Sequence, residues 1–190
     1  MLDKSYKNAL YDRVYKEKED PKEWAFTAQD LRRAAQILFD AKRDSSYPDG
    51  EPKNPEDEHM DGPATLLYGY AVENAIKGYL IKKHGSLKIA SLAGGSDWRS
   101  HRLLRLAEQT GIPLSQDLSL LLGTLEAFVR WAGKYPISLN RNEFTIPKQF
   151  CSGEHMTPNE LNWTTVEILD EFVKRLTNEI LREFHKKWNV

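Results

Sequence analysis

The hydrophobic residues of this chain recur at spacings of three and four over most of its length, which predicts helices rather than strands. The clearest case is the segment 63–81, PATLLYGYAVENAIKGYLI, where nearly every position is apolar or small and the apolar residues are not confined to one stripe. A helix that is apolar most of the way round lies inside a bundle and contacts neighbours on several sides. We therefore expect 63–81 to form the central helix of the fold, with Pro63 in its first turn and with Gly69 and Gly78 allowing close approach of a neighbouring helix or a ligand.

Five further segments show helical spacing, and the pattern predicts one all-α domain over residues 1–190, an up-and-down helical bundle of about five to six helices. Turn signals mark the boundaries of these segments. The first ends at Glu-Asp-Pro, the second before the proline-rich stretch that starts at residue 44, and the third at Gly111. Ser115 is the expected cap of the fourth, and Thr157, Pro158 and Glu160 form a capping box for the last. The predicted segments are 2–17, 23–43, 101–108, 115–133 and a long C-terminal helix from 157.

Three stretches between these helices lack helical spacing. Residues 44–62 hold three prolines, two glycines and an acidic cluster, which predicts a long connector, with a lid or a partner-binding segment as the alternative. The Gly/Ser-rich stretch 86–97 is predicted as a loop, and 134–156 as irregular, with at most a weak hairpin around FTIP at 144–147.

Composition narrows the class of protein. Of 190 residues, 40% are hydrophobic and 29% charged, which is typical of a soluble globular domain. The formal net charge of -1 means that any nucleic-acid binding would need a local basic patch. A single cysteine, Cys151, is compatible with a reducing compartment. The polar N-terminus does not resemble a signal peptide, and the polar residues at the centre of the 63–81 helix make membrane insertion costly. We expect a cytoplasmic protein without a membrane segment.

Those polar residues, Glu73, Asn74 and Lys77, are the first candidate site. Glu73 and Lys77 are four apart, with the acid on the N-terminal side, so they can pair along one face of the helix. One interpretation is a structural network to a neighbouring helix, because buried polar groups need partners. The other is a cleft in which a carboxylate and an amine have perturbed pKa values, as catalytic groups often do.

The second candidate is the densest basic patch in the chain, Trp98, Arg99, His101, Arg102 and Arg105. A spacing of three would place the arginines on one helix face, where they could hold phosphates while Trp98 stacks on a base. The alternative is a solvated helix face with His101 as a capping or packing residue.

The third candidate consists of Arg130, Trp131, Lys134 and Tyr135, at the end of the helix predicted over 115–133. The cations complement the helix dipole, and an aromatic ring flanked by cations can also bind a nucleotide. The five histidines show no metal-ligand spacing, and no phosphate-binding loop or dinucleotide fingerprint is present. The sequence therefore predicts neither a metal nor a cofactor.

Three stretches together resemble the HEPN superfamily of helical, nucleotide-binding proteins. They are LLYGYAVENAIKGYLIKKHG at 66–85, SHRLLRLAEQTGIPLS at 100–115, and WAGKYP at 131–136, which is similar to an Arg-Tyr-Pro ending but has Lys134 in place of arginine. With the helix that precedes them, the resemblance covers about 24–136. The N-terminal helix and residues 137–190, an irregular segment and a long helix, are additions to it.

The resemblance implies a helical bundle, a tendency to dimerise and a nucleotide- or RNA-binding cleft between helices. Many members are metal-independent ribonuclease toxins with an Arg-x(4–6)-His motif and a nucleotidyltransferase-like partner. In this chain no arginine precedes a histidine with four to six residues between them; the nearest approximation, Lys77 to His84, has six between but uses lysine.

We therefore expect a non-catalytic module that binds a nucleotide or RNA at Glu73, Lys77, His101, Arg102, Lys134 and Tyr135. Two alternatives are open. One is a divergent ribonuclease with His101 as acid and base and an arginine from Arg99, Arg102 or Arg130. The other is a structural protein that forms a homodimer through the apolar stripe of its last helix.

Overall fold

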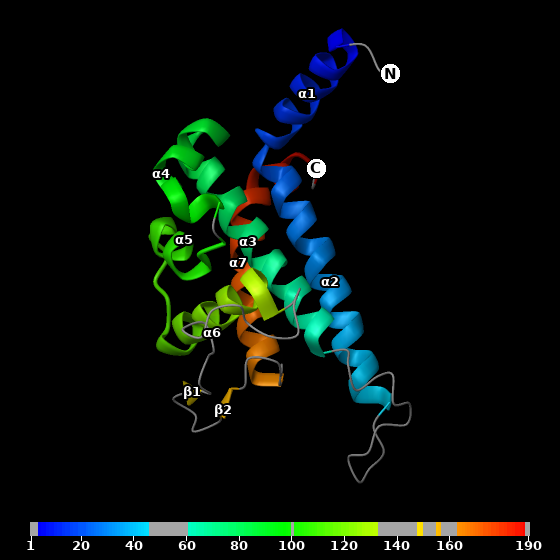
Figure 1. Ribbon diagram of the computed structural model, residues 1–190, viewed down its shortest axis with the longest axis vertical. Helices are drawn as coiled ribbons and strands as arrows, with labels where there is room; N and C mark the ends of the chain where they lie inside the picture. Colours follow the sequence, from blue (N-terminus) through cyan, green and yellow to red (C-terminus); the bar gives the residue numbers. More distant parts are fainter. Residues whose placement is uncertain are drawn as a thin grey trace.

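The computed structural model describes residues 4–45, 61–99, 101–132, 148–149, 155–156 and 163–188 (Figure 1). Within these residues seven α-helices pack together, which confirms the all-α prediction. They are α1 (Lys4–Lys18), α2 (Pro21–Ser45), α3 (Asp61–His84), α4 (Leu87–Arg99), α5 (Leu103–Thr110), α6 (Gln116–Ala127) and α7 (Trp163–Trp188). A π-helical segment, η2 (Phe128–Ala132), continues α6, and β1 (Lys148–Gln149) pairs antiparallel with β2 (His155–Met156).

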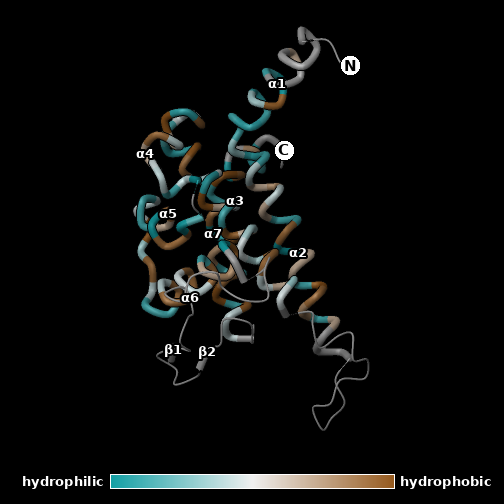
Figure 2. The backbone as a smooth tube through the Cα atoms, viewed as in Figure 1, coloured by the Kyte–Doolittle hydropathy of each residue, from teal (hydrophilic) through white to brown (hydrophobic). Residues whose placement is uncertain are grey.

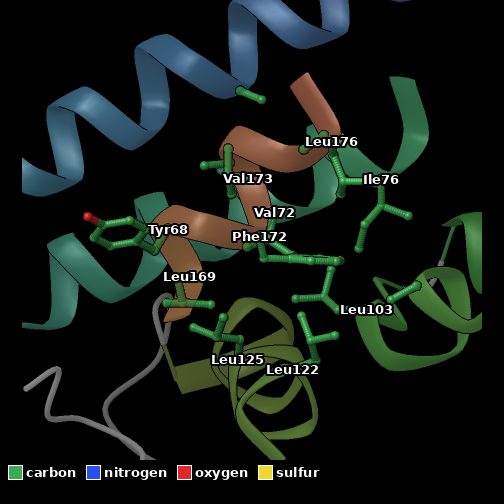
Figure 3. Close-up of a cluster of buried hydrophobic side chains, with 14 of the residues drawn as sticks. Tyr68, Val72, Ile76, Leu103, Leu122, Leu125, Leu169, Phe172, Val173 and Leu176 are labelled. Carbon is green, nitrogen blue, oxygen red and sulfur yellow. The ribbon is translucent and has the colours of Figure 1, made fainter. Parts of the chain in front are cut away.

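The helix α3 is the centre of the molecule, as its sequence predicts. It packs against α2, α4, α5, α6, η2 and α7, and its apolar residues point in several directions because neighbours cover it on several sides. Figure 3 shows how α3 contributes Tyr68, Val72 and Ile76 to a core that also receives side chains from α5, α6 and α7.

The three longest helices lie side by side. Along α2, hydrophobic and hydrophilic residues alternate at the helical spacing (Figure 2), so one face of α2 is buried against α3. The helix α7 runs parallel to α3, since Tyr68 contacts Asp170 and Lys82 contacts Glu179 further along both helices. The intervening helices α4, α5 and α6 bring the chain back so that α7 can run in this direction.

Two glycines of α3 allow close packing of helices. A Cβ on Gly69 would lie 2.2 Å from Cγ2 of Val129 in η2. A Cβ on Gly78 would lie 2.8 Å from Cβ of Trp24 and 3.1 Å from Cδ1 of Ile180. The expectation that these glycines serve close approach of neighbouring helices is confirmed.

The prediction of a loop over 86–97 is wrong, because α4 occupies this stretch. Ser86 Oγ accepts a hydrogen bond from the Ile89 backbone N–H at 3.1 Å and starts the helix. Gly94 is buried. A Cβ on Gly94 would lie 3.1 Å from the Trp98 ring and 3.5 Å from the Leu106 side chain. These packing contacts stabilise α4 although it contains two glycines, Gly94 and Gly95. Gly95 has a φ of 54° and lies at a kink in the helix.

The apolar stripe of α7 faces the core. Its members are buried: Val166, Leu169, Phe172, Val173, Leu176 and Ile180. Within the chain, α2, α3 and α6 cover these side chains; a homodimer stays a prediction.

Some predicted features lie outside the described residues. They are the capping box at 157–160, residues 46–60 of the connector, the segment 144–147 and Cys151. None of the helices within the described ranges combines the length and the apolar character needed to cross a bilayer.

Candidate functional site

Glu73, Lys77 and His101 come together in one cluster, which we call the Glu73 cluster. Lys77 Nζ lies 2.5 Å from Glu73 Oε1, and His101 Nδ1 lies 2.8 Å from Glu73 Oε2. The Glu73 side chain is buried and 6% exposed, the Lys77 side chain is partly buried and 11% exposed, and the His101 side chain is 34% exposed. One buried carboxylate thus holds two cationic or titratable groups, of which the histidine reaches solvent.

The backbone explains how these residues meet. Glu73 and Lys77 lie one turn apart on α3, so their pairing follows from helix geometry. His101 lies in the turn between α4 and α5 and has a φ of 56°, the one positive φ among the described residues other than glycine. A non-glycine residue in this region is uncommon and is held there by its surroundings, here by the hydrogen bond to Glu73.

The hydrogen-bonding pattern fixes the chemistry of the imidazole. An ionised carboxylate can only accept hydrogen bonds, so His101 donates its Nδ1–H to Glu73. The other ring nitrogen, Nε2, makes no hydrogen bond to the described residues. On a neutral ring Nε2 is therefore a proton acceptor, and on a protonated ring it is a donor.

Aromatic rings surround the cluster on α3 and α4. Tyr70 packs edge-on against the His101 ring at 6.5 Å between centroids. Lys77 Nζ lies 5.2 Å from the centre of the Trp98 ring, a cation–π arrangement. The same Trp98 ring meets the edge of Trp24 at 6.2 Å and packs on Gly94. The Trp98 ring therefore packs against other residues of the protein and borders the Glu73 cluster on the side of Lys77.

Asn74, although next to Glu73, is not part of the cluster. Its Nδ2 donates a hydrogen bond to the Tyr70 backbone carbonyl at 2.8 Å, one turn back in the same helix.

Arg102 and Arg130 each lie near a carboxylate. Arg102 Nε is 3.7 Å from Asp97 Oδ1 and its side chain is 41% exposed. Burial raises the pKa of the Glu126 carboxyl, and a hydrogen bond to the Leu104 backbone and the charges of Arg102 and Arg130 oppose that rise. Both arginines therefore lie near Glu126, where the start of α5, the end of α6 and η2 come together.

The prediction that Arg99, Arg102 and Arg105 share one helix face is wrong. Arg99 is the last residue of α4, whereas Arg102 is the N-cap of α5. Arg105 lies inside α5 and lines an open depression of about 630 Å³ with Asp97, Leu104, Glu108 and Gln109. The break between the two helices is what frees His101 to reach Glu73.

Three candidate residues cannot be placed in the cluster. Lys134, Tyr135 and the side chain of Trp131 lie outside the described residues. Their part in a binding cleft stays a prediction. Within the described residues, no group of three His, Cys, Asp or Glu side chains is arranged to hold a metal ion.

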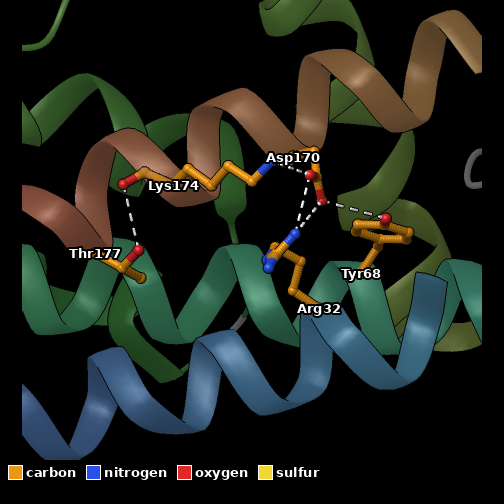
Figure 4. Close-up of polar contacts among 5 residues, drawn as sticks. All are labelled: Arg32, Tyr68, Asp170, Lys174 and Thr177. Atoms are coloured by element: carbon orange, nitrogen blue, oxygen red, sulfur yellow. Dashed lines mark hydrogen bonds and ion pairs between the residues drawn. The ribbon is translucent and has the colours of Figure 1, made fainter. Parts of the chain in front are cut away.

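A second polar cluster was missed in the sequence, and we call it the Asp170 cluster (Figure 4). Arg32 Nη1 donates to both Asp170 oxygens, at 2.8 and 2.9 Å, Lys174 Nζ lies 2.7 Å from Oδ2, and the Tyr68 hydroxyl is 3.4 Å from Oδ1. This cluster ties α2, α3 and α7 together. The spacing of Asp170 and Lys174 was a visible signal, but Arg32 lies 138 residues away.

The electrostatics of the Asp170 cluster are those of a structural ion pair. Burial alone would raise the pKa of Asp170, but hydrogen bonds and charge from Lys174 and Arg32 outweigh it and hold the pKa below its usual value. Burial, reinforced by the Asp170 charge, raises the pKa of the Tyr68 hydroxyl well above its ordinary value. Both groups therefore keep one protonation state at neutral pH.

Comparison with known proteins gives no relative, since no family model matches the sequence and no curated protein or solved structure shows significant similarity to the chain. Membership of the HEPN superfamily stays a prediction from the motifs.

Proposed function

We propose that this chain is a nucleotide- or RNA-binding helical module whose binding site is the Glu73 cluster. The observation that supports this proposal is the convergence of Lys77 and His101, from different parts of the chain, on one buried carboxylate. Glu73 orients both groups and leaves the exposed edge of the imidazole for a ligand.

A phosphate would approach the cluster from the side of His101, the most exposed member. The protonated ring would donate Nε2–H to a phosphate oxygen, and Arg102, the next residue along, has a guanidinium that matches the geometry of two phosphate oxygens. Arg102 and Arg130 both lie near Glu126, so a phosphate would compete with local carboxylates. We therefore expect moderate affinity that falls as salt is added.

The experiment compares the affinity of the full chain for a labelled single-stranded RNA and for a nucleoside monophosphate with that of two variants. His101→Asn removes the imidazole, and asparagine tolerates the positive φ at this position. Arg102→Ala removes the neighbouring guanidinium. We expect each to raise the Kd about tenfold or more, which corresponds to about 1.4 kcal/mol.

Arg105→Ala is the matched control, because Arg105 is an exposed arginine of the same helix that contacts none of the Glu73 cluster. Its Kd should equal that of the wild type. Equal loss of affinity in all three variants would point to general charge, and no loss in any of them would reject the site.

A second candidate function, metal-independent RNA cleavage, is favoured by the His101–Glu73 hydrogen bond. A carboxylate that holds a histidine through Nδ1 leaves Nε2 to act as a general base. His101 would take the proton of a ribose 2′-hydroxyl as its oxygen attacks the adjacent phosphorus. The bond from phosphorus to the 5′-oxygen then breaks, which leaves a 2′,3′-cyclic phosphate, and the 5′-oxygen takes a proton from water.

Cleavage is tested by incubating the full chain with RNA in the presence of EDTA. Cleavage that persists with EDTA and disappears in His101→Asn would establish this function. Binding without cleavage would leave the module as a binder.

A further inference from the structure

A groove of about 420 Å³ lies between α7 and the start of α6, and none of its lining residues belongs to the Glu73 cluster. Leu118, Ile168 and Phe172 form its apolar floor. The charged residues of its rim, Glu167, Glu171 and Arg175, all come from α7 and are exposed. Apolar clefts of this size with a few charged groups at the edge are typical binding sites.

The two glutamates of this groove have no partner among the described residues. Neither forms an ion pair or a hydrogen bond with a described side chain, although Asp170 and Glu179 of the same helix are both paired. Glu167 and Glu171 are four residues apart, where like charges repel. A cation placed between them would relieve this repulsion.

The helix α1 has the complementary properties. Its 15 residues contain five lysines and arginines and two acidic residues, a net charge of 5 − 2 = +3. Figure 1 shows α1 extending away from the bundle, and α2 is the element against which it packs. Val14 and Tyr15 are 44% and 39% exposed. A helix this short is only marginally stable alone, so covering its apolar residues would stabilise it.

α1 cannot reach the groove of its own chain. Trp24 Nε1 donates to the Lys18 carbonyl at 2.8 Å, and Lys18 Nζ lies 5.7 Å from the centre of the Trp24 ring, so the C-terminal end of α1 is held at the start of α2. From there α1 points away from α6 and from the start of α7 (Figure 1). If α1 fills the groove between α6 and α7, it must therefore be the α1 of another copy of the chain.

We propose that α1 of one copy binds the α6–α7 groove of a second copy. Val14 and Tyr15 cover the floor formed by Leu118, Ile168 and Phe172, and the positive charge of α1 faces Glu167 and Glu171. Glu167 and Arg175 are eight positions apart on α7, about 12 Å at the helical rise, which matches about two turns of α1. Reciprocal exchange of the two helices closes a symmetric dimer, and two small contacts strengthen each other.

The experiment measures self-association of the full chain by sedimentation equilibrium at low salt, up to about 1 mM, where even weak association is detected. Two double variants test the contact. The groove variant is Glu167→Lys/Glu171→Lys, and the helix variant is Arg13→Glu/Lys16→Glu, which changes the net charge of α1 from +3 to −1. Each should raise the dimer Kd about tenfold or more. Val14→Asp should weaken association as well. The combined four-site variant should recover association, because the charges are complementary again.

Asp30→Lys, at an exposed position of α2, is the matched charge control and should dimerise like the wild type. Circular dichroism checks that each variant is folded. A wild-type chain that stays monomeric, a groove variant that dimerises normally, or a four-site variant that fails to recover would each overturn the proposal. None of these readouts involves RNA, so the proposal stands or falls independently of the binding function.

Discussion

The Glu73 and Asp170 clusters are built from the same parts but expose different groups. Each has one buried carboxylate between two cationic or titratable side chains, with an aromatic residue beside it. In the Asp170 cluster the most exposed member is Lys174, at 52%, and the partners lie on the regular helices α2 and α7. In the Glu73 cluster it is His101, at 34%, in a turn with positive φ.

This difference separates a structural cluster from a candidate site. The Asp170 cluster joins three long helices, and Asp170 and Tyr68 keep fixed protonation states at neutral pH because their pKa values are shifted away from neutrality. The Glu73 cluster instead holds an imidazole whose Nδ1 is bonded to Glu73 and whose side chain is 34% exposed. The ion pairs of the two clusters are similar and do not distinguish them. What distinguishes them is the type of the exposed residue and its backbone conformation.

The largest effect is expected from Asp170→Ala. It leaves Arg32, whose side chain is 20% exposed, without its carboxylate. An unpaired buried charge is costly, so the free energy of unfolding should fall by about 3 kcal/mol, measured by urea denaturation. Lys174→Ala is the control: the Lys174 side chain is half exposed, and its loss should cost less than about 1 kcal/mol. Similar losses in the two variants would show that Asp170 is not the centre of a buried cluster.

Acid should remove the contribution of Asp170. Because its pKa is lower in the folded protein than its ordinary value of 3.8, the stabilisation is present above that pH and is lost as pH falls toward the folded pKa. The difference in unfolding free energy between the wild type and Asp170→Asn should therefore shrink below about pH 4. A difference that stays constant down to pH 2 would contradict this assignment.

A smaller effect is expected from Gly69→Ala, which tests how α3 and η2 are held together next to the Glu73 cluster. The new methyl group would lie 2.2 Å from the stiff, buried side chain of Val129. Overpacking should cost about 1–3 kcal/mol in thermal or urea unfolding. Gly123→Ala is the opposite case, because nothing lies within 4 Å of its Cβ position, and it should stabilise α6 by up to about 1 kcal/mol. A stabilised Gly69→Ala variant would show that the two elements do not need this close approach.

The smallest effect at neutral pH is expected from Tyr68→Phe. The hydroxyl lies a long 3.4 Å from Asp170, so its loss should cost about 1 kcal/mol or less. Tyr68 matters more in alkali: its pKa is raised above its ordinary value of 10.0 in the folded state, so the unfolded chain ionises first and stability falls as pH rises above about 10. Tyr68→Phe should lose less stability there than the wild type. Parallel alkaline profiles would contradict this account.

Much of the fold could be predicted because local signals agree with it. Gly85 and Gly111 adopt left-handed conformations at the ends of α3 and α5, with φ of 75° and 76°, and Ser115 Oγ accepts the Leu118 N–H as an N-cap. The α4 prediction failed because Gly94 lowers local helix propensity while gaining packing against Trp98 and Leu106. Local propensity cannot reveal a contact with a residue twelve positions away.

In the candidate sites too, contacts within one helix could be predicted from the sequence, whereas contacts between helices could not. The Glu73–Lys77 pair could be predicted because its spacing lies within one helix. The contact of His101 with Glu73 depends on the turn between α4 and α5, where Arg99, Arg102 and Arg105 are redirected from the single helix face that their spacing suggested. The Asp170 cluster joins residues 102 and 138 positions apart, so only tertiary packing brings it together.

The central claim is that His101 presents its Nε2 to a phosphate-bearing ligand. The most direct measurement is nitrogen-detected NMR of ¹⁵N-histidine-labelled protein during titration with single-stranded RNA, with His101→Asn used to assign the signals. We predict that the His101 ring signals shift and saturate with the bound fraction, while those of His84 and His185 stay unchanged. A complex that forms while the His101 signals remain in place would contradict the account.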